Sequence, residues 1–113
     1  MEYRITVAEL ESFIKSSSNI MQEDEIKDFI DYISLSPKSG DIIPDTGGIR
    51  KVRWKVKDKG KRSGVRVIYF YYNQNAPLFL LHAYAKNEET DLSSDKKKIM
   101  KNLVNEIINI YKV

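Results

Sequence analysis

Two apolar runs near the middle of the chain constrain the fold more than any other feature. Residues 65–72 and 78–85 are rich in β-branched and aromatic side chains, and only residues 73–77 separate them. Side chains of these types favour buried strands, and so short a turn joins two strands only in an antiparallel pair. The sequence therefore predicts a buried antiparallel hairpin at the centre of a sheet.

A third strand is predicted directly before this hairpin. Residues 49–56 alternate in character, which in a strand places successive side chains on opposite faces. One face then carries mainly cations and the other mainly apolar groups: Ile49, Lys51, Arg53 and Lys55 on the first, and Arg50, Val52, Trp54 and Val56 on the second. The polar segment 57–64 is expected to be the hairpin loop, and the turn-rich segment 40–48 a connecting loop.

Helical periodicity is present on both sides of these strands. Residues 22–35 place apolar side chains at i, i+3, i+4 and i+7, and their first turn is acidic, which suits a helix N-terminus. A shorter helix is expected over 7–16, with Thr6 and Glu9 at capping-box spacing. Residues 94–111 predict a third helix with a buried stripe: Ile99, Leu103, Val104, Ile107, Ile110 and Tyr111.

These elements predict one α+β domain over residues 1–113, with two N-terminal helices, a three- to four-stranded antiparallel sheet and a C-terminal helix. The number of strands stays open because residues 3–7 could form a short strand or lead into the first helix. No apolar run approaches the roughly 20 residues that span a bilayer, and the N-terminus lacks a signal-peptide pattern. We therefore expect a cytoplasmic protein without a membrane partner.

Charge is distributed unevenly along the chain. Residues 1–45 carry four Lys or Arg against ten Asp or Glu, a net charge of −6, whereas residues 46–113 carry fifteen against six, a net charge of +9. Within residues 50–66 there are nine basic residues and one acid. Such a concentration of positive charge indicates a polyanionic partner, although a solubilising loop has the same composition.

Several kinds of chemistry are excluded by composition. The chain has no cysteine and a single histidine, which removes thiol nucleophiles, cysteine-ligated metals and histidine pairs. We expect His82, inside an apolar run, to pack or to hydrogen-bond locally rather than to hold a metal. The sequence also lacks a glycine-rich phosphate loop. We therefore expect neither a metal nor a cofactor.

The remaining chemistry resides in basic side chains on the predicted sheet. Four of them can converge in an antiparallel arrangement and are the candidate catalytic residues: Lys51, Arg53, Arg66 and Lys86. RNA supplies its own nucleophile, the 2′-hydroxyl, so cleavage needs only proton transfer and stabilisation of negative charge on the phosphate. Further contacts to RNA are expected from a wider set: Arg50, Lys55, Lys57, Lys59, Lys61, Arg62 and Asn87. These residues suit either a nuclease or a passive RNA binder.

Three blocks of the sequence resemble the HigB branch of the RelE/ParE toxin superfamily. They are residues 40–53 (GDIIPDTGGIRKVR), 61–69 (KRSGVRVIY) and 83–88 (AYAKNE), and they keep the family's order and spacing. The resemblance covers about residues 22–111. It implies a RelE-like fold and the toxin half of a type II toxin–antitoxin pair. Such toxins typically enter the ribosomal A site and cut mRNA, and a cognate antitoxin neutralises them.

The resemblance also implies roles for single residues. It gives three strand residues the roles of base and phosphate stabiliser: Lys51, Arg53 and Arg66. RelE has a further arginine near the end of its last strand, where this chain has Lys86, and a tyrosine in its C-terminal segment, where Leu92 lies near. Lys86 is therefore the best candidate for the general acid. Tyr84 is a candidate replacement for the tyrosine, although an aromatic strand residue is more often part of the core.

Three functions remain open from the sequence. The first is a ribosome-dependent mRNA endonuclease, and the second is a non-enzymatic inhibitor of DNA gyrase, as in the ParE branch. The third is an RNA or ribosome binder that does not cleave. The basic segment 50–66 favours RNA, because binding to a protein does not require so high a net charge. A steep loss of affinity with salt would separate an RNA binder from a gyrase inhibitor.

Overall fold

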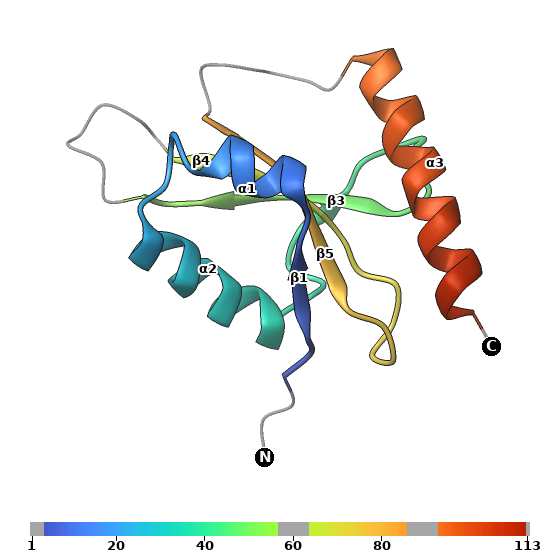
Figure 1. The fold of residues 1–113 in the computed structure, drawn as a ribbon, viewed down its shortest axis with the longest axis horizontal. Helices are drawn as coiled ribbons and strands as arrows, with labels where there is room; N and C mark the ends of the chain where they lie inside the picture. Colours follow the sequence, from blue (N-terminus) through green and yellow to red (C-terminus); the bar gives the residue numbers. More distant parts are fainter. Residues whose placement is uncertain (1–3, 57–63, 86–92, 113) are drawn as a thin grey trace.

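The structure, a computed structural model, describes residues 4–56, 64–85 and 93–112. Its elements follow in the order β1 (Val7–Glu9), α1 (Glu11–Ser17), α2 (Glu23–Leu35), β2 (Asp41–Ile42), β3 (Ile49–Trp54), β4 (Val65–Phe70), β5 (Leu78–Ala85) and α3 (Ser94–Tyr111). The strands form one sheet, with α1 and α2 on one face and α3 on the other (Figure 1). The predicted α+β class and the three helices are confirmed.

The sheet differs from the predicted one in the number and direction of its strands. Its order is β1-β5-β4-β3-β2, and β1 runs parallel to β5, so the described sheet is mixed and five-stranded. The capping box predicted at Thr6 and the helix start at residue 7 are wrong, since β1 occupies these positions and α1 begins at Glu11. The loop predicted over 40–48 likewise contains β2. Strands of two or three residues are too short to produce a recognisable alternation.

The longer elements agree with their predictions. α2 begins at Glu23, where the backbone N–H of Gln22 donates to the Glu25 carboxylate at 2.8 Å. α3 and β5 have the predicted bounds. β3 and β4 each end two residues earlier than predicted, at Trp54 and Phe70. Periodicity over six or more residues was therefore sufficient to locate these elements.

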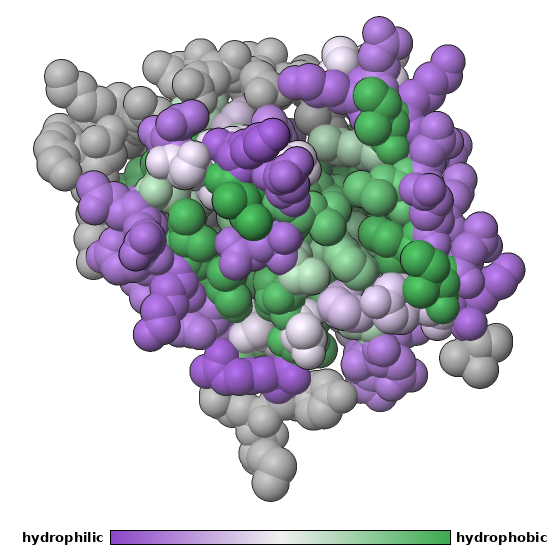
Figure 2. Space-filling model, viewed as in Figure 1, coloured by the Kyte–Doolittle hydropathy of each residue, from purple (hydrophilic) through white to green (hydrophobic). Residues whose placement is uncertain are grey.

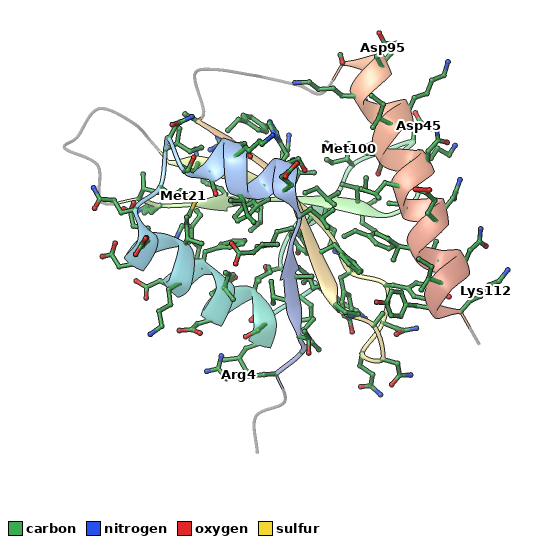
Figure 3. The ribbon with its side chains drawn as sticks, viewed as in Figure 1. Arg4, Met21, Asp45, Asp95, Met100 and Lys112 are labelled. Atoms are coloured by element: carbon green, nitrogen blue, oxygen red, sulfur yellow. The ribbon has the colours of Figure 1, made fainter. Side chains whose placement is uncertain are left out.

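Two apolar cores lie on opposite faces of the sheet (Figure 3). The first packs beneath α1 and α2 and is formed by Ile5, Phe13, Met21, Phe29, Ile33, Val65, Val67, Tyr69, Leu78, Leu80 and Ala83. The second packs beneath α3 and is formed by Ile49, Ile68, Phe70, Leu81, Tyr84, Val104 and Ile107. Alternation along β4 supplies side chains to both cores in turn, which fixes the face that each of its residues occupies.

The stripe predicted for α3 is buried only in part. Val104 and Ile107 lie in the second core, but Ile99 is 68% exposed and Ile110 is 72% exposed. Figure 2 shows isolated apolar groups among the charged side chains at this side of the molecule. The prediction for Ile99 and Ile110 is wrong because periodicity identifies residues that share a helix face, but not how much of that face a sheet covers.

Side chains of α1 protect the edge of β5 beyond the end of β1. The Ser12 hydroxyl donates to the Leu81 carbonyl at 2.5 Å, and the Ala83 N–H donates to the Ser16 hydroxyl at 2.9 Å. An open strand edge otherwise presents unpaired backbone groups to solvent or to other chains. These two bonds therefore close the edge and hold α1 against the sheet.

Tyr69 ties the segment after α2 to the centre of the sheet. Its fully buried hydroxyl donates to the Pro37 carbonyl and accepts from the Gly40 N–H, both at 2.8 Å. A Cβ on Gly40 would lie 2.9 Å from both the Tyr69 ring and the Lys51 carbonyl, so glycine is required for this close approach. Burial raises the pKa of Tyr69 above its ordinary value, and the hydrogen bond from Gly40 opposes this in part.

Removal of the Tyr69 hydroxyl tests whether its hydrogen bonds hold the segment after α2 against the sheet. Tyr69→Phe should lower the free energy of unfolding by about 1–3 kcal/mol at pH 7, because two buried backbone groups lose their partner. The raised pKa means that the phenol ionises first in the unfolded chain, so its contribution is complete below about pH 10 and declines above it. Urea denaturation between pH 7 and 11 should show the wild-type advantage shrinking above pH 10. A constant advantage across that range would contradict the assignment.

Candidate nucleic-acid interface

The ladder of β3 and β4 brings three predicted cations onto one face of the sheet. Residues directly opposite each other in an antiparallel pair share a face, and the register pairs Arg53 with Arg66 and Lys51 with Ile68. Tyr84 of β5 lies opposite Arg66 on its other side. This is the face that α3 covers in part. We call Lys51, Arg53 and Arg66 the cationic row.

The two arginines lie together without an anionic partner among the described residues. Arg53 is exposed, whereas Arg66 is half-buried and its Nη1 has no hydrogen-bond partner within the described part of the chain. Like charges directly opposite each other destabilise a strand pair, and a buried polar group without a partner costs about 1–3 kcal/mol. The fold therefore holds an excess of positive charge that a bound anion would neutralise.

Lys51 borders a hollow of about 290 Å³ beside the row. Its lining comes from β2 and the following turn, from the sheet and from α3: Asp41, Ile42, Ile43, Pro44, Lys51, Tyr84 and Lys97. Asp41 faces Lys51 across the β2–β3 ladder, yet no ion pair within 4 Å joins them. The hollow thus combines an apolar wall with charges of both signs, which suits a polar ligand with flat apolar faces, such as a nucleotide.

Sequence reasoning missed two charged residues of this hollow. Asp41 was assigned to a loop because β2 is too short to predict. Lys97 lies in a run of three lysines at the start of α3, and a run of identical residues does not reveal which one faces the sheet. The only available signal was the positive charge of that run.

Arg50 lies on the opposite face of β3, as the alternation predicts. Its Nη1 donates to the Gly40 carbonyl at 2.7 Å and to the Lys38 carbonyl at 3.4 Å. These bonds join β3 to the segment after α2. They give Arg50 a structural role on the far side of the sheet from the cationic row.

Lys55, predicted to contact RNA, lies just past the end of β3. It is exposed and, with Tyr32, Arg53 and Trp54, lines a shallow hollow of about 320 Å³. Trp54 is held there by rings of α2, with its centroid 5.3 Å from that of Phe29. The other predicted site residues lie outside the described residues, and their roles stay predictions: Lys57, Lys59, Lys61, Arg62, Lys86 and Asn87.

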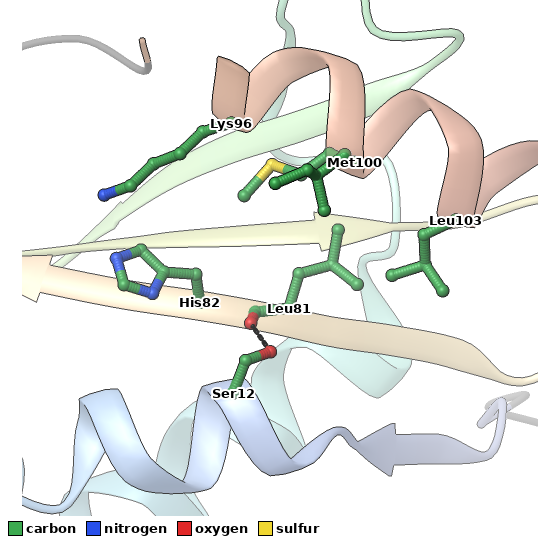
Figure 4. Close-up of a pocket in the computed structure, with 7 residues that line it drawn as sticks. Ser12, Leu81, His82, Lys96, Met100 and Leu103 are labelled. Atoms are coloured by element: carbon green, nitrogen blue, oxygen red, sulfur yellow. Dashed lines mark hydrogen bonds between the residues drawn. The ribbon is translucent and has the colours of Figure 1, made fainter.

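His82 lies on the same face, on β5. It is opposite Ile68, and its ring centroid is 6.0 Å from that of Tyr84. Together with Met100 and Leu103 of α3 it lines an apolar pocket (Figure 4). These contacts fit the packing role expected for it. Within residues 4–56, 64–85 and 93–112, no group of three or more His, Asp or Glu side chains could hold a metal ion, and no helix is long and apolar enough to cross a membrane.

Comparison with known families identifies a match that spans this site. A family described as the RelE toxin of the RelE/RelB toxin–antitoxin system matches residues 37–112, about two thirds of the 113-residue chain. The matched span includes every strand from β2 to β5 and the helix α3. It therefore contains the whole cationic row and the hollow beside it.

A charge-removing substitution tests the excess of positive charge. Arg66→Met keeps an unbranched stem in place and should raise the free energy of unfolding by about 1 kcal/mol at low salt, because a like-charge contact and an unpaired buried nitrogen are removed. Inorganic phosphate should raise the melting temperature of the wild type more than that of the variant. Lys112→Met, at the exposed end of α3, is the control and should change neither quantity. An unchanged response to phosphate in Arg66→Met would show that the row does not bind anions.

Proposed function

Because this chain belongs to the RelE toxin family, we propose that it is a ribosome-dependent endoribonuclease that cuts mRNA. Family membership makes it the toxin of a toxin–antitoxin system, with an antitoxin as its partner. RelE toxins generally inhibit translation. We further propose that the chain cleaves mRNA, that it needs the ribosome to do so and that it belongs to the HigB-like branch. Because the proposed substrate is mRNA on the ribosome, we propose that it acts in the cytoplasm.

The pairing of Arg66 with Arg53 across β3 and β4, with an Arg66 Nη1 that has no hydrogen-bond partner within the described residues, is the observation that supports cleavage best. A phosphate between them would accept hydrogen bonds from both side chains and would neutralise their mutual repulsion. Attack on the phosphorus adds negative charge to its oxygens in the transition state. Donors held in place beforehand stabilise that state more than the ground state, and this difference accelerates the reaction.

The proposed reaction uses the nucleophile that RNA carries. The 2′-oxygen attacks the adjacent phosphorus, the bond to the 5′-oxygen breaks, and the products are a 2′,3′-cyclic phosphate and a 5′-hydroxyl. Lys51, at the edge of the hollow, is proposed to accept the proton of the 2′-hydroxyl. Lys86, just past β5 in the sequence, is proposed to return a proton to the leaving 5′-oxygen. No step of this chemistry requires a metal ion.

The hollow beside the row is proposed to hold the nucleotide next to the cleaved bond. Lys97 approaches it from α3 and can contact a phosphate, while Ile42 and Pro44 form an apolar wall for a base. Lys55 and the basic residues that follow it in the sequence would continue the contact along the RNA backbone. This arrangement accounts for the concentration of positive charge within residues 50–66.

Primer extension on an mRNA translated in a purified system tests this function. The wild type should produce breaks in phase with codons, only when ribosomes are present. Arg66→Ala and Lys51→Ala should each reduce the rate of cleavage about 100-fold or more, because each removes a group that acts in the transition state. Lys27→Ala is the matched control, since Lys27 is exposed on α2, across the sheet from the row, and it should cleave like the wild type.

Two other outcomes would point to the other functions. Intact mRNA with translation still arrested would replace the nuclease with an RNA- or ribosome-binding inhibitor. Undisturbed translation would redirect attention to DNA gyrase. Thermal unfolding of each variant shows whether a lost activity reflects a lost fold.

A further inference from the structure

An apolar pocket of about 200 Å³ opens between α1, β5 and α3. It is lined by Ser12, Leu81, His82, Lys96, Ile99, Met100 and Leu103 (Figure 4). The hydrogen bond between the Ser12 hydroxyl and the Leu81 carbonyl satisfies these two polar groups at its floor. The pocket therefore favours an apolar side chain over a polar ligand.

Ile99 extends this apolar surface onto the outside of the molecule. It is 68% exposed and stands at the rim of the pocket. A single exposed isoleucine is ordinary in a soluble protein, and Ile110, 72% exposed further along α3, lines none of the pockets described above. Ile99 differs from Ile110 because it lies at the rim of an open pocket. A single bound side chain could therefore bury Ile99 and fill the pocket at the same time.

Charge around the pocket indicates the nature of that occupant. Residues 95–101 of α3 carry four lysines and one acid, Asp95. Lys96 lines the pocket, and Lys98 and Lys101 are exposed on the same turns of the helix. An apolar pocket with a basic rim is complementary to an acidic segment that presents a large apolar side chain.

We propose that this pocket is a docking site for the antitoxin, which inserts an apolar side chain from an acidic segment and covers Ile99. Family membership supplies the partner, and the apolar lining argues against RNA as the occupant. A second copy of this chain is a poorer fit, because its acidic helix α2 already buries its own apolar stripe, with Phe29 and Ile33 in the first core.

The position of the pocket gives this docking a consequence for the cationic row. His82 lines the pocket and lies two residues before Tyr84, which is opposite Arg66. The pocket and the cationic row therefore occupy one face of the sheet and are neighbours along β4 and β5. An acidic segment held in the pocket brings negative charge beside the row and weakens its attraction for RNA.

Two glutamate substitutions on α3 provide a matched test. Ile99→Glu places a carboxylate at the rim, whereas Ile110→Glu makes the same change at an equally exposed position away from the pocket. With the purified cognate antitoxin, titration calorimetry should show affinity reduced about 30-fold or more for Ile99→Glu, the loss typical of a central contact. Ile110→Glu should bind within threefold of the wild type.

The competing outcomes are distinguishable from each other and from failure of the nuclease proposal. Wild-type affinity of Ile99→Glu for the antitoxin overturns the docking site, whether or not the toxin cleaves mRNA. Loss of a concentration-dependent dimer in Ile99→Glu, with antitoxin binding intact, assigns the pocket to self-association instead. Loss of ribosome binding alone assigns it to the ribosome. Circular dichroism of both variants confirms that each is folded.

Discussion

The register of β4 against β3 is the constraint on which the rest of the molecule depends. Val67 and Tyr69 point into the core beneath α1 and α2, and Ile68 and Phe70 into the core beneath α3. A shift of one residue would exchange these sets and turn Arg66 into the first core, so the apolar side chains of both cores hold the register. Burial of large side chains on both faces thereby holds two arginines opposite each other, a cross-strand pairing that is unfavourable in isolation.

The edges of the sheet then determine where ligands can approach. At β5, the serines of α1 occupy the edge that β1 leaves open. Between β2 and β3, the Thr46 hydroxyl donates to the Ile43 carbonyl at 2.7 Å and accepts from the Ile49 N–H at 3.1 Å, which fixes a tight turn. That turn holds the wall of the hollow beside Lys51. These bonds therefore fix the backbone on both sides of the strands that carry the cationic row.

The sequence was informative where a pattern extends over several residues and uninformative where contacts are remote. Short connections placed Arg53 and Arg66 on adjacent strands, and period 3.6 located α2 and α3, because both signals are local. The parallel pairing of β1 with β5 joins segments about 70 residues apart and leaves no local trace. The hollow needed β2 and one lysine of a uniform run, so Asp41 and Lys97 could be assigned to it only from the structure.

The position of α3 links the two sites that we propose on this face. It buries Val104 and Ile107 against the sheet, places Lys97 at the hollow beside Lys51 and presents its lysine-rich first half beside the apolar pocket. RNA and an acidic partner would then draw on the same excess of positive charge, so binding of one reduces the affinity for the other by an equal factor. The antitoxin could then neutralise the toxin without contacting Arg53 or Arg66. Negative charge within a Debye length of these arginines is sufficient to lower their affinity for RNA.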